Sequence, residues 1–535
     1  MIWFLRDIDL LSVLARAATL AFEALLLGGV AFLFVVVRPA RASEAVEDFC
    51  RRGIRAAALA LVVGELAMVS SSGALLLSGS DLTLSDVMTT SFFRADLFAI
   101  LFAIGLWICA RFKSNKAAIA SVALSFLLLA ATVSTSHAAA RIDQRVLLAL
   151  LTVAHHVGTA VWVGAMAYLL ISLGRVESPS EARLLTQRYS RMAMFGAATL
   201  VLAGVGMAWF YVGSWSATYT TAYGIMLVAK IYLFLVMIAL GAGNWFLVRR
   251  LASDPTPLLA RLRRVVEAEV CLGFLAVLTA ASLTAQAPAV DVAAQDRLTS
   301  HEIYVRLHPE PPRMSSPPLA ALAPPSSLAV AVQDSQFVPT VGSDDTDRAW
   351  SEYNHHWAGL IVLIAGLLAL LSRYRTMRWA RFWPLSFAGL AVFILLRADP
   401  ENWPLGPRPF WQSFASPDVL QHRVGAILIV VFAAFECAVQ AGKLKARWAS
   451  YVFPAMCGLG AALLLTHEHS AKDVKEAMLA EMSHTPIALL GMTAGCSRWL
   501  ELRLPKSRMA TIASYLWPVC LALVGYILLN YRELP

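Results

Sequence analysis

Long apolar runs that are almost free of charge limit most strongly what this chain can fold into. Residues 117–136, 146–173 and 225–247 are each about 20 residues or longer, enough for an α-helix to cross a hydrocarbon core of about 30 Å. The chain has 535 residues, 59% of them hydrophobic and 15% charged, which is too apolar for a soluble chain of this size. The sequence therefore predicts an all-α, polytopic transmembrane bundle whose outer surface contacts the lipid bilayer.

Hydropathy predicts about 14 spans, in two blocks. The first block, residues 1–290, holds about eight of them: 10–37, 54–78, 92–110, 117–136, 146–173, 192–212, 225–247 and 265–286. Residues 291–354 are rich in proline and acidic residues, which is typical of an extended aqueous linker. The second block, residues 355–535, holds about six: 357–372, 380–397, 421–441, 448–466, 485–500 and 510–530.

The basic residues predict how these spans are threaded. Alternating the spans places 28 of the 44 Lys and Arg residues in loops on one side, and by the positive-inside rule that side is cytoplasmic. Both termini and the linker are then periplasmic, in a bacterial inner (plasma) membrane, and we expect no removed signal peptide. Because the net charge of +9 is scattered over short loops, it does not indicate a nucleic-acid partner.

Several classes of chemistry have no support in the sequence. The seven cysteines form no C-x-x-C pair, which argues against a disulfide framework or a thiolate metal site. No Gly-rich phosphate loop, nucleophile elbow or zinc-protease helix motif is present. We therefore expect the protein not to be an enzyme.

The histidines follow the predicted topology, because none of the 11 lies in a loop predicted to be cytoplasmic. Six from the second block reach the outer face: His355, His356, His422, His467, His469 and His484. Neutral imidazole is a common ligand of transition metals, and copper in particular accepts sites with several nitrogens. We expect two to four of these six to share one metal site; the alternative is that they are structural, since an imidazole ring is tolerated at a membrane interface.

Local spacing restricts which of these side chains can cooperate. If a helix continues through His467 and His469, the two rings point about 200° apart and cannot chelate one ion; if the helix ends near Thr466, they can. His484 lies just before Pro486, a residue suited to a first helical turn, which predicts a ring at a helix mouth.

Three histidines of the first block form another candidate site. His137 follows a predicted span, and His155 and His156 lie about nine residues into the next one, roughly 14 Å below its outer end. A histidine at that depth is costly unless it has a partner, which makes it a candidate for function. The alternative is a structural hydrogen bond to a neighbouring Ser or Thr.

Glu23, Glu65 and Lys230 are predicted to lie within the membrane. Pairing a Glu with the Lys would lower the desolvation cost of both, and such a pair either stabilises the bundle or accompanies ion passage. Met68, Met166 and Met207 carry thioethers suited to Cu(I), although most of the 16 methionines are expected to serve packing.

Several ordered segments of the first block resemble a known family. They are Ser136–Ala139, His155–Gly164, Tyr223–Lys230, Glu267–Glu269 and Leu283–Thr284. Together they resemble the copper resistance D (CopD/PcoD) family over about residues 10–290, and the second block, including Ala349–Trp357, looks like a C-terminal membrane extension. The resemblance implies an inner-membrane protein of copper transport and tolerance, working beside a periplasmic copper carrier protein.

The hypothesis from the sequence is a copper-handling membrane protein with two histidine sites at its outer face. The first contains His137, His155 and His156, and the second draws on the six histidines of the second block. Two alternatives remain open. Histidines facing one another across spans can bind haem, as in a b-type membrane cytochrome, and a copper protein of this kind can also deliver copper for respiratory oxidase assembly.

Overall fold

The computed structural model describes residues 8–79, 83–250, 255–317, 344–399, 402–414, 417–465, 474–504 and 507–533. These residues form helices and no strand, and thirteen of the helices are long and apolar enough to cross a membrane. The predicted all-α, multispan architecture is confirmed. The chain divides into two compact units, Met1–Ala293 and Ala294–Pro535, with eight of the thirteen helices in the first and five in the second.

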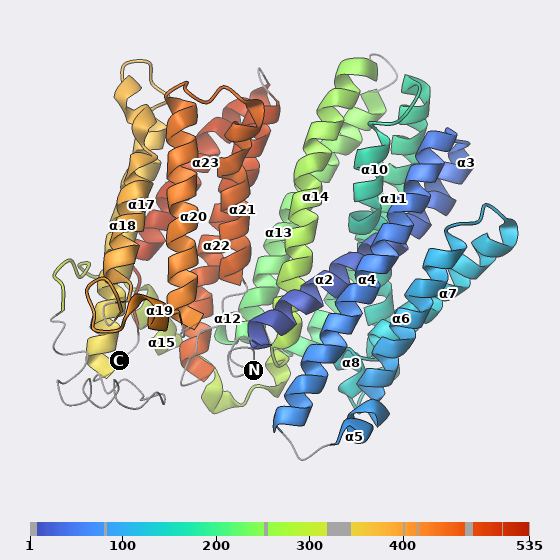
Figure 1. Cartoon of the computed structure of the whole chain (residues 1–535), viewed down its shortest axis with the longest axis horizontal. Helices are drawn as coiled ribbons and strands as arrows, with labels where there is room; N and C mark the ends of the chain where they lie inside the picture. The colour runs from blue at the N-terminus through green and yellow to red at the C-terminus, as the bar shows by residue number, and fades with distance from the viewer. Residues whose placement is uncertain are drawn as a thin grey trace. The chain divides into compact units, whose positions relative to one another are not determined.

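Unit 1 is a bundle in which several membrane helices bend or change type along their length (Figure 1). Its elements are α2 (Ile8–Ala31), the π-helical η1 (Phe32–Val37), α3 (Arg38–Ala40), α4 (Glu44–Gly79), α5 (Leu84–Thr89), α6 (Ser91–Cys109), α7 (Asn115–Val133), α8 (His137–Ala140), α9 (Arg145–Thr159), the π-helical η2 (Ala160–Gly164), α10 (Ala165–Ser172), α11 (Pro179–Val212), α12 (Ala217–Thr220), α13 (Ala222–Arg250), α14 (Pro255–Ala285) and η3 (Ala289–Asp291).

Local sequence explains where these helices begin. Ser178 accepts a hydrogen bond from the N–H of Glu181, and Pro179 occupies the first turn of α11, where its missing N–H costs nothing. Ser114 caps α7 in the same way. These helix starts of unit 1 thus follow from side chains next to them in the sequence.

Close packing of α2 against η2 fixes the centre of unit 1. An added Cβ at Gly164 would lie 1.8 Å from the carbonyl oxygen of Ala24, and one at Gly28 would lie 2.5 Å from that of Ala160. Only glycine permits this approach of two backbones. As a result, Glu23 on α2 and the histidines of α9 are held on neighbouring helices.

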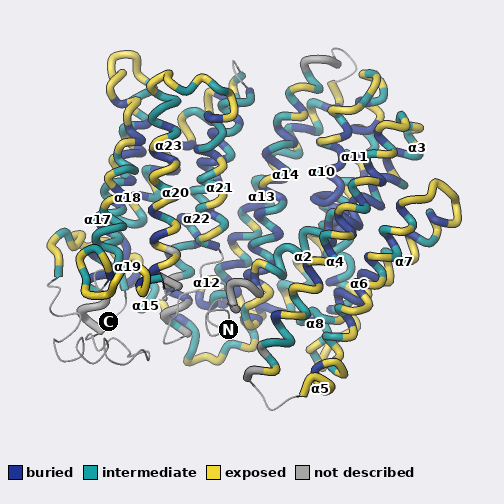
Figure 2. Tube along the Cα trace, in the orientation of Figure 1, coloured by how far each residue is buried: buried dark blue, intermediate teal, exposed yellow. Residues whose placement is uncertain are grey.

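The outward faces of α6 and α7 are apolar and exposed (Figure 2). Phe98 and Leu101 on α6 and Ile119 and Phe126 on α7 are each at least half exposed. Such a surface suits contact with lipid acyl chains and not with water.

Unit 2 packs its helices around aromatic side chains. Its elements are η4 (Ala294–Asp296), α15 (Ser300–Leu307), α17 (Asp344–Leu371), η6 (Arg378–Phe382), α18 (Leu385–Arg397), α19 (Phe410–Ser413), α20 (Pro417–Gln440), η7 (Arg447–Tyr451), α21 (Val452–Leu465), α22 (Val474–Arg503) and α23 (Arg508–Leu529). Trp383 and Trp517 are each 1% exposed, with ring centroids 5.3 Å apart, and Phe453 packs against both.

Part of the predicted linker is folded against unit 2. Thr299 and Glu302 form a capping box that starts α15, and Arg306 on this helix donates to the hydroxyl of Ser483 at 2.6 Å. The carboxylate of Glu302 accepts from Lys475 at 3.0 Å. Helix α15 therefore packs on α22, while the predicted division into residues 1–290, 291–354 and 355–535 stays a prediction.

One local prediction in unit 2 is wrong. The sequence predicts Pro486 in a first helical turn with His484 at a helix mouth, but both lie inside α22, which begins at Val474. A proline within a membrane helix is tolerated when neighbouring groups satisfy the freed carbonyl, so it does not mark a helix start here. The predicted span 485–500 falls in this helix, which is not among the thirteen apolar ones.

Candidate functional site

A cavity of about 500 Å³ inside unit 1 collects the predicted residues of the first block. We call it the histidine cavity. Its walls include all six of the candidate side chains predicted there: Glu23, Glu65, His137, His155, His156 and Lys230. They come from α2, α4, α8, α9 and α13, so the fold brings together residues that the sequence places far apart.

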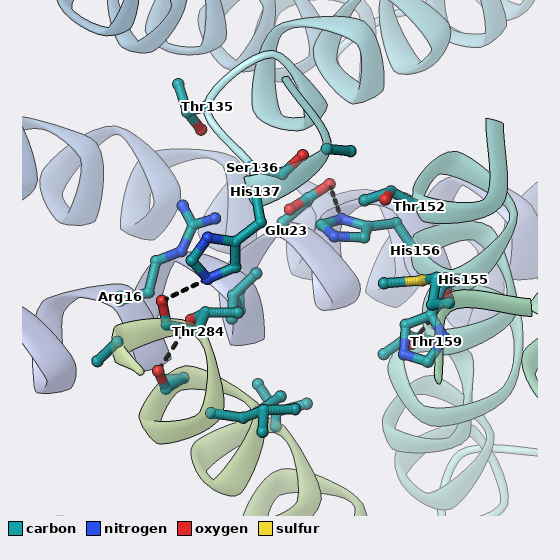
Figure 3. A pocket seen from close by; sticks show the side chains of 18 of the residues that line it. Arg16, Glu23, Thr135, Ser136, His137, Thr152, His155, His156, Thr159 and Thr284 are labelled. Carbon is teal, nitrogen blue, oxygen red and sulfur yellow. Dashed lines mark hydrogen bonds and ion pairs between the residues drawn. The ribbon is translucent and has the colours of Figure 1, made fainter. Parts of the chain in front are cut away.

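His156 and Glu23 form the central contact of the histidine cavity (Figure 3). Nδ1 of His156 lies 3.1 Å from Oε1 of Glu23, and the hydroxyl of Thr132 donates to the same oxygen at 3.1 Å. The Glu23 side chain is 5% exposed and the His156 side chain 18%. When Nδ1–H of His156 donates to Glu23, the lone pair of Nε2 is left free to bind a ligand.

His155 contributes a second nitrogen. Its Nδ1 is buried and has no hydrogen-bond partner among the described residues. An added Cβ at Gly204 would lie 3.9 Å from this ring, so α11 packs closely beside it. A buried ring nitrogen without a partner is costly unless the site gains a ligand.

His137 reaches the cavity from α8, next to the end of α14. Its Nε2 donates to the carbonyl oxygen of Thr284 at 3.0 Å, and its ring lies edge-on to Tyr211 with centroids 6.5 Å apart. Burial lowers the pKa of His137 below its ordinary value, which favours the neutral ring. Nδ1 then keeps a lone pair.

Charged and soft side chains complete the cavity wall. Arg16, Asp96, Met68 and Met207 line it together with Glu65. Arg16 and Asp96 are not among the site residues predicted from the sequence, although a charge inside an apolar run was the signal available for both. Most methionines are expected to serve packing, and the structure adds the thioethers of Met68 and Met207 to the histidine wall.

The donors of the histidine cavity do not form a finished metal centre. Across the described ranges, no three His, Cys, Asp or Glu side chains come close enough to hold one metal ion. An ion in this cavity would therefore meet few protein ligands at once.

Of the second-block histidines that the structure describes, it brings His355 and His484 together. The His355 ring stacks on Tyr531 with centroids 3.8 Å apart, its Nδ1 donates to the carbonyl oxygen of Ser351 at 2.8 Å, and the His484 ring lies 6.4 Å away. His422 pairs through Nδ1 with Asp399 at 2.9 Å. His467 and His469 lie outside the described residues.

Both ring nitrogens of His356 are used by the protein itself. Nδ1 accepts from the backbone N–H of Arg313 at 2.7 Å, and Nε2 donates to the carbonyl oxygen of Tyr531 at 2.8 Å. The residue is 2% exposed. In this arrangement no lone pair of His356 is open to a metal.

Two comparisons with known proteins place part of the chain among copper proteins. Residues 183–283 match the family described as copper resistance protein D. This confirms the predicted resemblance to that family over residues 183–283. The copper resistance protein D region covers most of α11, all of α13 and most of α14, so it includes Lys230 and Met207 but not His137, His155 or His156.

One curated relative shares part of the chain. The copper transport protein CutJ of Bacillus subtilis (strain 168) is 28% identical over 177 residues, which are 32% of this chain and 31% of the relative. The match thus spans less than a third of that protein's length. No solved structure matches the chain.

Proposed function

We propose that this protein transports copper across the bacterial inner membrane and that the histidine cavity binds the ion on its way. The arrangement of Glu23, His156 and the cavity supports this most directly, because the carboxylate orients an imidazole whose other nitrogen is free. In metal sites of many kinds, a carboxylate holds the far nitrogen of a ligating histidine in this manner. Copper is then the cargo of the protein and not a resident cofactor.

The donor chemistry of the cavity suits copper. His137, His155 and His156 each keep a ring nitrogen that makes no hydrogen bond described above, and Met68 and Met207 add soft sulfur atoms. Imidazole binds copper in both common oxidation states, and thioethers favour Cu(I). These nitrogen and sulfur donors favour copper over Mg²⁺ or Ca²⁺, which prefer oxygen ligands.

The charged residues of the cavity have a role in the same proposal. Glu23 holds His156, while Glu65 and Asp96 offset part of the positive charge of an arriving ion. Lys230 and Arg16 balance these carboxylates when the ion has left. In this proposal Glu23 pairs with His156 and not with Lys230, the Glu–Lys pair being one expectation from the sequence.

The proposal extends to the outer face of unit 2. A second copper site there would draw on His355 and His484, whose rings lie 6.4 Å apart, together with His467 and His469. A periplasmic copper carrier protein is the partner that would supply the ion at this face. Transport by such a protein needs no covalent chemistry, in keeping with a role that is not enzymatic.

The test is a copper titration of the purified full-length protein, with metal content and absorption spectrum measured together. The variant His155→Ala/His156→Ala should lose the copper that the parent binds in unit 1. His301→Ala is the matched control, because His301 is exposed on α15 and lies outside the cavity. Equal copper in parent and double variant would overturn the proposal, and a Soret band would point to haem instead.

A further inference from the structure

Unit 1 contains a second cavity, of about 420 Å³, farther along the same helices. Each of α11, α13 and α14 lines both cavities with different stretches. On each helix, one lining residue of the histidine cavity comes closest in sequence to one lining residue of the second cavity. These pairs, histidine cavity first, are Gly204 and Ala197 on α11, Lys230 and Ile238 on α13, and Val277 and Glu269 on α14. Seven or eight residues of α-helix span roughly 10–12 Å, so the two cavities follow one another along the bundle.

Aromatic side chains line the second cavity or pack beside it. Trp162, on the π-helical η2, packs edge-on against Phe234 of α13 with ring centroids 5.5 Å apart. Tyr189 donates to the carbonyl oxygen of Trp162 at 2.8 Å. Single turns of π-helix recur at functional sites in proteins, and this one lies where the two cavities approach each other.

Glu269 and Asn244 meet at the wall of the second cavity. Nδ2 of Asn244 donates to Oε2 of Glu269 at 2.6 Å. Asn244 is 7% exposed and Glu269 is 3% exposed. Oε1 of Glu269 and Oδ1 of Asn244 are both buried without a hydrogen-bond donor in the described part of the chain. Two buried acceptors without a donor, on two residues joined by a hydrogen bond, indicate a site for a positively charged ligand.

No positive side chain among the described residues lining the second cavity supplies that charge. The cavity is lined by α10, α11, α13, α14 and Trp162 of η2, and its ionisable side chains are Glu269 and Tyr189; α2 contributes none. The Tyr189 hydroxyl is already donated to Trp162. A carboxylate buried in such surroundings is strongly destabilised unless a cation binds to it.

A proton fits the pair better than a metal ion does. No group of three His, Cys, Asp or Glu side chains surrounds Glu269 or any other described residue. One proton on Oε1 of Glu269 removes the negative charge and turns an unpaired acceptor into a donor. Oδ1 of Asn244 can then accept a hydrogen bond from it. A carboxylic acid and an amide then match, each with one donor and one acceptor.

We propose that Glu269 and Asn244 form a proton-binding site in the second cavity. The site would bind a cation other than copper, a proton, in the second of the two cavities of unit 1. The site does not depend on the histidine cavity, so copper binding and proton binding can fail separately.

Infrared spectroscopy of the copper-free, full-length protein tests this directly, because a protonated carboxyl group has a C=O stretching band that a carboxylate lacks. At neutral pH, Glu269→Gln should lose the intensity of one carboxyl group from this band. Glu267→Gln is the matched control, since Glu267 lies two residues earlier, on another face of α14, and outside the cavity. An unchanged band in Glu269→Gln would overturn the proposal.

The variant Asn244→Leu tests the pair itself. Removal of the amide should shift the Glu269 band to the higher frequency of a carboxyl group without a hydrogen bond. A band at the parent's frequency would show that Asn244 is no part of the site and would overturn that half of the proposal. Elution on size-exclusion chromatography establishes that each variant is folded, and Gln, as the isostere of a protonated Glu, keeps the packing of α14.

Discussion

Nδ1 of His156 lies 3.1 Å from Oε1 of Glu23, across an interface between two helices, and the two residues are 133 positions apart in the sequence. The contact sets the tautomer of His156 and turns its Nε2 toward the histidine cavity (Figure 3). It therefore links the packing of α2 against α9 and η2 to the proposed binding of copper.

Replacing Glu23 with Gln should weaken copper binding about 10- to 100-fold, the usual effect of losing a partner that orients a metal ligand. Gln fills the same space but carries no charge to hold the Nδ1–H tautomer. The dissociation constant is measured by competition with a copper chelator. Thr132→Val is the control, because it removes only the second hydrogen bond to Glu23 and should have a smaller effect. Equal affinity in Glu23→Gln and the parent would contradict the role given to Glu23.

Gly164→Ala should separate α2 from η2. Its Cβ would lie 1.8 Å from the carbonyl oxygen of Ala24, a backbone atom that cannot move without shifting the helix. Overpacking of this kind costs about 1–3 kcal/mol or more, and the shift should also weaken the contact of Glu23 with His156. Thermal unfolding and the copper titration measure the two effects. Gly243→Ala has open space around it and should leave both unchanged or raise stability slightly; equal behaviour of the two variants would refute the argument.

Sequence reasoning predicts the membrane helices well, because a long apolar run has few alternatives to a spanning helix. It also singles out His155, His156, Glu23, Glu65 and Lys230 from the cost of placing such groups in lipid, and His137 from its place at the end of a span. The structure places all six along one cavity. Sequence reasoning cannot predict that Glu23 pairs with His156, since the partner of a buried charge depends on which helices are neighbours.

The second block shows where local patterns mislead. Pro486 suggests a helix start near His484, but contacts with α21 and α23 maintain one continuous α22 through both residues. His356 looks like a ligand in the sequence, yet two backbone groups distant in the chain occupy its nitrogens. Neither outcome has a signal within a few residues of the side chain concerned.

His356→Ala should lower the stability of unit 2 without changing the amount of copper bound. The substitution removes two hydrogen bonds and leaves the N–H of Arg313 and the carbonyl of Tyr531 unpaired, a cost of about 2–4 kcal/mol if each group loses about 1–2 kcal/mol. Thermal unfolding and metal analysis of the same sample measure both quantities. A variant that loses copper and keeps its unfolding temperature would instead assign His356 to a metal site.

Glu501→Ala should destabilise unit 2 strongly. The carboxylate of Glu501 accepts from Arg373 at 2.6 Å, from Arg498 at 2.8 Å and from the indole N–H of Trp517 at 2.8 Å. Its loss leaves Glu436, which lies 3.6 Å from Arg498, to balance the two arginines. Removing one member of a buried ion network costs about 3–5 kcal/mol.

The control for this network is Glu44→Ala. Glu44 also faces a basic residue, Lys113, at 3.8 Å, but its side chain is 93% exposed, so its removal should have no measurable effect on stability. Unfolding temperatures of the two variants give the comparison. A small change in Glu501→Ala, similar to that in Glu44→Ala, would mean that water reaches Arg373 and Arg498 and that the network contributes little to holding α17, α22 and α23 together.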